Sequence, residues 1–320
     1  MLEFIDDLGH GIYAIDTDFQ RPRLAAAYLM VADGRAAFID TGTNFAVPRL
    51  LAALDGLGLA PAAVDWVIPT HVHLDHAGGV GLLMQSLPTA QVLVHPRGQR
   101  HMIDPGALWQ GALAVYGEAE MLRSYGQLQP VAAERVLASH DEQTIHLGTR
   151  PLRLIDTPGH ARHHHCIWDA QTRGWFTGDT FGLSYREFDN DAHGAWALPT
   201  STPVQFDPPA LKASIRRMLG HQPQAMYLTH YSRVSDIERL ADLLLSQIDE
   251  MAALGLALKD APDRHRQLVD GLWAGYARRL AEHGCALAPA QQHALLAMDI
   301  ELNAQGLGVW LDRAERTTPA

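Results

Sequence analysis

The feature that most constrains this chain is the run T-H-V-H-L-D-H-A-G-G at residues 70–79. It places His71, His73, Asp75 and His76 within six consecutive positions. Imidazoles and a carboxylate packed this densely are costly to desolvate unless a cation pairs with them, so the run predicts a metal site rather than a solvated polar loop. In an extended segment His71 and His73 project from the same side, whereas Asp75 and His76 follow after the chain turns. The four ligands are therefore spaced for two neighbouring metal ions.

Composition limits the classes of function. With 320 residues, of which 47% are hydrophobic and 19% charged, the chain can bury one large core and carry an appended subdomain. The formal net charge of -11 argues against a nucleic-acid partner, and two cysteines give no disulfide framework. The N-terminus lacks a leader pattern and no apolar run reaches the ~18 residues of a membrane span, so we expect a cytoplasmic protein without a membrane partner.

The first half of the chain is predicted to be α/β, with the ligand run directly after a strand. Residues 96–135 look helical and loop-rich, and they exceed an ordinary connection, which indicates a lid or pocket wall. The expected strands are Gly11–Phe19, Leu24–Ala32, Ala36–Ile39, Val64–Pro69 and Gln91–His95, and the expected helices are Val47–Leu57 and Gly81–Leu87.

The second half repeats this arrangement. Its strand ends carry the motifs T-P-G-H (157–160), T-G-D-T (177–180) and T-H-Y (229–231). Open α/β sheets place their sites just beyond the carboxyl ends of strands, so these motifs are candidate ligands. The expected strands are Thr144–Leu147, Leu152–Thr157, His165–Trp168, Gly174–Thr177 and Ala225–Leu228, and Asp207 is expected to cap a helix over Pro209–Leu219.

From Ser235 onward the pattern is helical alone. Ser235 and Glu238 form a capping-box pattern, and further helices are expected over Arg264–His283 and Pro289–Gln305. We therefore predict a catalytic domain at 1–234, with a helical insertion at about 96–135, and a helical subdomain at 235–320. The amphipathic stripes of this tail are typical of helix packing, and they leave a homodimer open.

The order of the motifs resembles the metallo-β-lactamase-fold hydrolase superfamily. The H-x-H-x-D-H run is followed by the histidine of T-P-G-H, the aspartate of T-G-D and a late T-H, and F-I-D-T-G at 38–42 is similar to the superfamily's opening D-T-G. The resemblance covers about residues 10–235 and implies a four-layer αββα sandwich. It implies one metal on His71, His73 and His160, a second on Asp75, His76 and His230, and Asp179 as the bridge.

The complete set with a bridging aspartate is similar to glyoxalase II, to the acyl-homoserine-lactone lactonases and to phosphodiesterase-like members. No cysteine occupies the bridging position, which argues against the β-lactamase branch that uses a cysteine ligand. Nitrogen and oxygen ligands suit Zn²⁺, and also Mn²⁺ or Fe²⁺.

The predicted function is a dinuclear metal-dependent hydrolase acting on a small ester, lactone, thioester or phosphoester. A bridging hydroxide would attack the substrate, Asp75 would orient it and pass a proton to the leaving group, and Asp40 would accept a hydrogen bond from a ligand imidazole. His164 lies four residues after His160, where the superfamily often has a supporting histidine, although the His163–His165 run could equally be surface or strand polar residues. Candidate pocket residues are Trp109, Tyr185 and Tyr231.

Two other functions remain open. The first is an iron-dependent oxygenase of the persulfide-dioxygenase type on the same fold, for which a site with a single iron is expected. The second is a non-catalytic, metal-stabilised binding protein, in which loss of Asp75 would leave the biological activity intact. The motifs specify how water is activated, and they leave the substrate undetermined.

Overall fold

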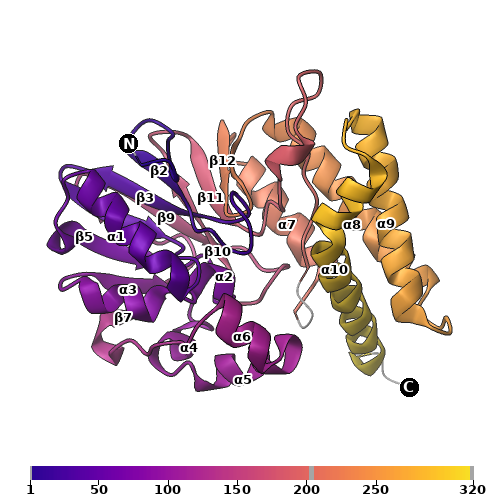
Figure 1. The fold of residues 1–320 in the computed structure, drawn as a ribbon, viewed down its shortest axis with the longest axis horizontal. Coiled ribbons are helices and arrows are strands. Elements are labelled where there is room, and N and C mark those ends of the chain that lie inside the picture. Colours follow the sequence, from indigo (N-terminus) through magenta and orange to yellow (C-terminus); the bar gives the residue numbers. More distant parts are fainter. Residues whose placement is uncertain (1, 202–204, 318–320) are drawn as a thin grey trace. The chain divides into compact units, whose positions relative to one another are not determined.

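The computed structural model describes residues 2–201 and 205–317, and it divides into two compact units (Figure 1). The first unit comprises residues 1–156, 163–178 and 223–235. The second comprises residues 157–162, 179–222 and 236–320. The domain boundary predicted at 234/235 stays a prediction.

The first unit contains a seven-stranded mixed sheet whose strands lie in sequence order. β1 to β4 are antiparallel, and β4 to β7 are parallel. The predicted hairpin turn at Asp33-Gly34 joins β3 to β4. The strands are β1 (Ile5–Asp7), β2 (Ile12–Asp16), β3 (Ala26–Ala32), β4 (Arg35–Ile39), β5 (Val64–Ile68), β6 (Gln91–Val94) and β7 (Val136–Ala138).

A second, six-stranded sheet belongs to the same unit. Its order is β13-β12-β11-β10-β9-β8, and all neighbours are antiparallel except β11 and β12. The strands are β8 (Thr144–Leu147), β9 (Arg150–Asp156), β10 (His165–Asp169), β11 (Gly174–Gly178), β12 (Ala225–Leu228) and β13 (Ser232–Val234).

The two sheets share one apolar core, and helices cover the other face of the first sheet. Tyr28 of β3, Leu152 of β9 and Phe176 of β11 belong to the cluster between the sheets. Side chains of β4 and β5 pack on α1 (Val47–Gly56) and α3 (Val80–Ser86), which lie beside β5 in Figure 1. Pro48 occupies the first turn of α1, where its missing N–H costs no hydrogen bond.

Short helices fill the segment predicted as a lid or pocket wall. They are α4 (Gln99–Ile103), α5 (Gly106–Tyr116) and α6 (Glu118–Ser124), which Figure 1 shows grouped together. The remaining short elements of the first unit are α2 (Leu74–Ala77), η1 (Asn44–Ala46), η2 (Pro61–Ala63) and η3 (Ala133–Arg135).

The second unit is helical: η4 (Arg186–Phe188), α7 (Pro208–Leu219), α8 (Ile237–Ala257), α9 (Arg264–His283) and α10 (Pro289–Thr317). The Asp207 side chain caps α7 by accepting from the Ala210 N–H, as expected. The capping box at Ser235 is wrong, because α8 begins after Asp236 and the Asp236 side chain makes no cap hydrogen bond. Among residues 2–201 and 205–317 no helix is long and apolar enough to cross a membrane.

Candidate metal centre

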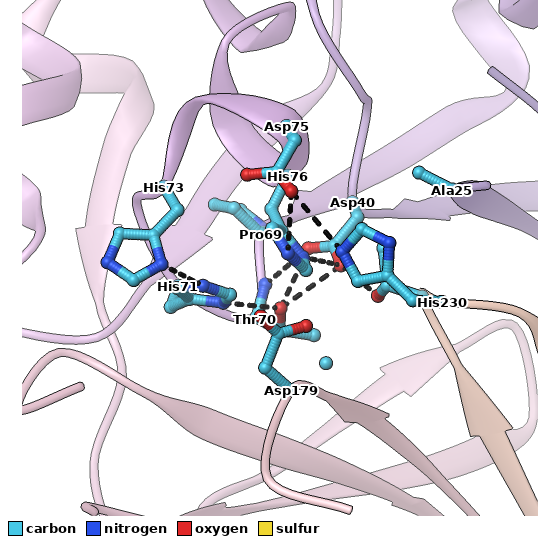
Figure 2. Close-up of polar contacts among 12 residues, drawn as sticks. Ala25, Asp40, Pro69, Thr70, His71, His73, Asp75, His76, Asp179 and His230 are labelled. Atoms are coloured by element: carbon cyan, nitrogen blue, oxygen red, sulfur yellow. Dashed lines mark hydrogen bonds and ion pairs between the residues drawn. The ribbon is translucent and has the colours of Figure 1, made fainter. Parts of the chain in front are cut away.

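Two parallel strands bring the first site residues together. β4 and β5 are neighbours, so Asp40, just beyond β4, and Thr70, just beyond β5, lie side by side (Figure 2). His73 has extended dihedral angles and directly precedes α2, whose first turn carries Asp75 and His76. The predicted change from extended chain to turn after His73 is therefore present.

His71 and His73 face each other with ring nitrogens. His71 Nε2 lies 2.7 Å from His73 Nδ1, and the two rings are nearly perpendicular (Figure 2). His71 is fully buried and His73 is partly buried. Two imidazole nitrogens aimed at the same point suit a shared cation.

A second cluster in the first unit consists of Asp75, His76 and His230. Their ligand atoms all lie within 4.8 Å of one another. Asp75 Oδ2 is 3.2 Å from His230 Nε2 and 3.7 Å from His76 Nε2. His230 comes from the end of β12, so this cluster combines segments that lie about half the chain apart.

In His230 and His76 the outer ring nitrogen, Nδ1, makes a hydrogen bond away from Asp75, and the inner one, Nε2, faces Asp75. His230 Nδ1 donates to the Leu24 carbonyl oxygen at 2.8 Å, and His76 Nδ1 donates to Asp40 Oδ2 at 2.8 Å. Because a carboxylate oxygen and a carbonyl oxygen accept hydrogen bonds, each imidazole has a proton on Nδ1, which leaves Nε2 as the nitrogen that can bind a cation. Two such nitrogens lie beside the Asp75 carboxylate, an arrangement that fits a divalent metal ion.

Asp40 organises these contacts from a buried position. Besides His76, its carboxylate accepts from the Thr70 N–H at 2.7 Å, the Thr70 hydroxyl at 3.0 Å and the Thr229 hydroxyl at 2.8 Å. Asp40 is 1% exposed. The role of the two threonines was not predicted from the sequence, although each directly precedes a candidate ligand histidine in a T-H pair. That repeated pair is the signal that could have revealed them.

Gly178, in the T-G-D motif, permits a close approach of chain segments here. A Cβ at Gly178 would lie 2.5 Å from Thr70 Oγ1 and 2.6 Å from His164 Nε2, and its φ is +47°. Only glycine fits both the backbone conformation and the space.

The second unit places its two predicted ligands together. His160 Nε2 lies 3.2 Å from Asp179 Oδ2. His160 Nδ1 donates to the Thr200 carbonyl oxygen at 3.1 Å, so here too the inner nitrogen is the one with a lone pair. The pattern seen at His76 and His230 is thus repeated in this pair.

The His163–His165 run is buried, so the alternative of a surface run is wrong, whereas His165 is the first residue of β10, as the strand alternative expects. His164 stacks on His71, with ring centroids 4.7 Å apart. His165 accepts at Nδ1 from the Ser139 hydroxyl and donates from Nε2 to the Pro69 carbonyl, and its burial lowers its pKa to about 3. His165 is therefore neutral and holds the chain just before the H-x-H motif.

The candidate pocket residues have different surroundings. Trp109 is half-buried on α5. The Tyr185 hydroxyl donates to Asp299, and the Tyr231 hydroxyl donates to Asp6 Oδ2 at 3.4 Å. Their roles in a pocket stay predictions.

Tyr116 and Tyr125 are the tyrosines on which the Asp75 charge acts. The ring of Tyr116 is partly exposed, but its hydroxyl lies among protein atoms, and this burial together with the Asp75 charge raises its pKa to about 12. Burial, followed by charges that include Asp75, also raises the pKa of Tyr125. Both tyrosines belong to the 96–135 segment that the sequence predicts as a lid or pocket wall.

Known proteins of similar sequence support the resemblance that the motifs indicate. The family model described as the Metallo-beta-lactamase superfamily matches residues 21–230. The chain is 28% identical over 230 residues to the metallo-beta-lactamase fold-containing protein ST1585 of Sulfurisphaera tokodaii, covering 71% of this chain and 79% of that protein. A crystal structure of ST1585 from Sulfolobus tokodaii has a TM-score of 0.60, with 75% of this chain and 86% of that chain covered.

Two further likenesses differ in coverage. The acyl-coenzyme A thioesterase MBLAC2 of Gallus gallus is 29% identical over 192 residues, which cover 54% of this chain and 63% of that protein. The chain thus spans less than two thirds of this relative. The metallo-beta-lactamase family protein TTHA1429 from Thermus thermophilus has a TM-score of 0.66 at 20% identity and covers 97% of this chain and 95% of that chain, which shows the fold alone. The predicted αββα sandwich with an all-α extension is confirmed.

Proposed function

Because this chain belongs to the metallo-β-lactamase superfamily and is a metal-dependent hydrolase of that superfamily, we propose that it cleaves a small thioester or a related ester or lactone. The thioester is favoured because MBLAC2, the relative that shares 192 aligned residues, is named as a thioesterase. The two histidine and aspartate clusters can hold metal ions. Two ions per chain, with Zn²⁺ as the expected metal, belong to the proposal.

The observation that carries the proposal is the orientation of the imidazoles. In His76, His230 and His160 the outer nitrogen donates to a fixed acceptor, while the inner nitrogen faces a carboxylate. A structural histidine cluster would need no such shared orientation. The ligands that we assign are His71, His73 and His160 for one ion, Asp75, His76 and His230 for the other, and Asp179 for both.

The chemistry divides between the metal ions and the chain. Divalent ions, when bound, lower the pKa of water and polarise the substrate's carbonyl oxygen. Asp75 is only partly buried, so its carboxylate can take a proton from the attacking water as the new C–O bond forms and give it to the leaving group as the old bond breaks. Asp40 holds His76 in the required tautomer, and His164 supports the ring of His71.

Metal reconstitution tests the proposal directly. Protein stripped of metal and reloaded with Zn²⁺, Mn²⁺ or Fe²⁺ should regain hydrolysis of a panel of acyl thioesters, aryl esters and lactones, with two ions per chain by elemental analysis. Failure to turn over any substrate with every metal would refute the hydrolase assignment. A single ion per chain at saturation would refute the dinuclear assignment.

The Asp75→Asn variant tests the proposed proton transfer. Loss of the carboxylate should lower kcat by about 10²- to 10⁴-fold, the usual contribution of a positioned acid or base. Asp33→Asn is the matched control, because Asp33 is an exposed aspartate on the β3–β4 turn and should leave kcat unchanged. Equal kcat values for Asp75→Asn and the unmodified protein would contradict the assigned role.

A further inference from the structure

Helix α5 is an apolar helix that the first unit leaves largely uncovered. Its sequence, G-A-L-W-Q-G-A-L-A-V-Y, has no charged residue in a chain with a formal net charge of -11. As the structure describes them, none of its 11 residues is buried, although the helix contacts α4 and α6. Val115 is 44% exposed, Tyr116 is 36% exposed, and Leu122 on α6 is 53% exposed. An uncharged helix with no buried residue is therefore a candidate binding face.

One side of α5 forms an apolar stripe that ends at a pair of tyrosines. Trp109, Leu113 and Tyr116 are separated by four and three positions, so they lie on one side of the helix and extend about 10 Å along it. The Tyr116 ring lies 5.6 Å from the Tyr125 ring. Burial, with a contribution from the Asp75 charge, raises the pKa of both hydroxyls. We call Trp109, Leu113 and Tyr116 the α5 stripe.

Beneath the surface, the buried rings of Tyr125 and Phe19 connect α5 to the loop that follows β4. The Tyr125 ring lies 5.5 Å from the Phe19 ring. A Cβ at Gly126 would lie 3.6 Å from the Phe45 ring, and Phe45 itself is 58% exposed. Phe45 lies five residues after Asp40, so apolar side chains extend from α5 to the segment that carries the metal-centre aspartate.

We propose that the α5 stripe binds the straight acyl chain of the substrate and thereby selects its length. This inference rests on the proposed function, because it places the acyl carbonyl near Asp75 and the attached chain along α5. An alkyl chain is narrow and uncharged, and so is the stripe. A chain that lies along it therefore removes apolar surface from water without desolvating a charge.

A second copy of the chain fits this face less well. A stable interface buries roughly 800 Å² on each partner. Helix α5 is about 16 Å long and about 10 Å wide, so it projects only about 160 Å². The area of α5 alone therefore suits a ligand chain, and a dimer interface would have to include other elements as well.

A chain-length series on the metal-loaded enzyme tests the proposal. For N-acetylcysteamine thioesters from acetyl to decanoyl, kcat/KM should rise about two- to fourfold for each added methylene until the stripe is covered. Leu113→Asp should flatten this dependence, so that within this variant kcat/KM for the decanoyl thioester falls toward that for the acetyl thioester. Trp109→Ala is a second variant with the same expected direction. Leu256→Asp, at a 60% exposed leucine on α8, is the control and should keep the full dependence.

Binding of decanoate, measured by titration calorimetry, separates this inference from the proposed function. Decanoate should bind the unmodified protein with a negative heat-capacity change and bind Leu113→Asp at least tenfold more weakly. If no thioester is hydrolysed but this binding pattern holds, the hydrolase proposal fails and the chain-binding face stands. Turnover without chain-length dependence would overturn the inference. So would a dimer of the unmodified protein that Leu113→Asp dissociates, since a second copy would then cover the face.

Discussion

Replacing Asp40 by asparagine should weaken metal binding without removing any metal ligand. The amide keeps one acceptor oxygen and turns the other into a donor NH₂ group. If the oxygen retains the Thr70 N–H, the NH₂ group faces His76 Nδ1, which must then become an acceptor. The His76 proton moves to Nε2, and the lone pair directed at Asp75 is lost.

The expected size of this effect follows from the role of Asp40 as a support for a ligand. Loss of such a supporting hydrogen bond lowers metal affinity by about 10- to 100-fold, which corresponds to about 1.4 to 2.7 kcal/mol. The Thr70 N–H and hydroxyl can still donate to the remaining oxygen, so the loop should stay folded. We therefore expect a change in affinity that exceeds any change in secondary structure.

Competition with a chelator of known affinity measures the change, and circular dichroism of the metal-free proteins checks the fold. Asp33→Asn is a close control, because Asp33 also accepts from a threonine N–H and hydroxyl, those of Thr149, but lies on an exposed turn. Its metal affinity should equal that of the unmodified protein. Unchanged metal affinity and stoichiometry in Asp40→Asn would refute the tautomer argument. An equal loss of metal affinity in Asp40→Asn and Asp33→Asn would show that the effect is not specific to Asp40.

Two further predictions concern buried groups away from the ligands. Burial lowers the pKa of His165 to about 3 against about 6.5 when unfolded, so its stabilisation is present above pH 6.5 and is lost as the pH falls. Urea unfolding measures the free energy of unfolding at pH 7 and at pH 5, and the difference between the two should be about 2 kcal/mol smaller in His165→Gln than in the unmodified protein. His146→Gln, on the exposed side of β8, should keep the full difference. Arg150→Met should destabilise the protein by about 3–5 kcal/mol, because it leaves the buried Asp169 carboxylate without its guanidinium partner. A loss below about 1 kcal/mol in urea unfolding would contradict that reasoning.

The sequence predicted the elements with strong periodicity well. The helix over Arg264–His283 has the expected bounds, and the strands that lead into the ligand motifs lie within a few residues of those predicted. Short edge strands were missed: β1, β7 and β13 have three residues each, too few to show an alternating pattern. Helix α10 continues beyond the predicted Gln305 because its residues pack on α8 and α9, which local propensity does not reveal.

The candidate ligands were predictable because their residue types and spacing are chemically unusual. The hydrogen-bond acceptors that hold these ligands in place were predictable only in part. Asp40 belongs to a recognisable motif, but the Leu24 carbonyl that fixes His230 is a backbone atom, and any residue type could supply it. The effect of the Asp75 charge on the pKa of Tyr116 depends on how α5 packs in the folded chain, which no local pattern in the sequence encodes.

The hydrogen bond from Thr229 to Asp40 joins residues 189 positions apart, and that from His230 to Leu24 spans 206 positions. Closing loops of this length belongs to the slowest part of folding. The Asp75, His76 and His230 cluster therefore comes into existence only after both sheets have assembled. A metal ion that binds there should leave the folding rate unchanged and slow unfolding. Metal occupancy would therefore extend the lifetime of the folded protein.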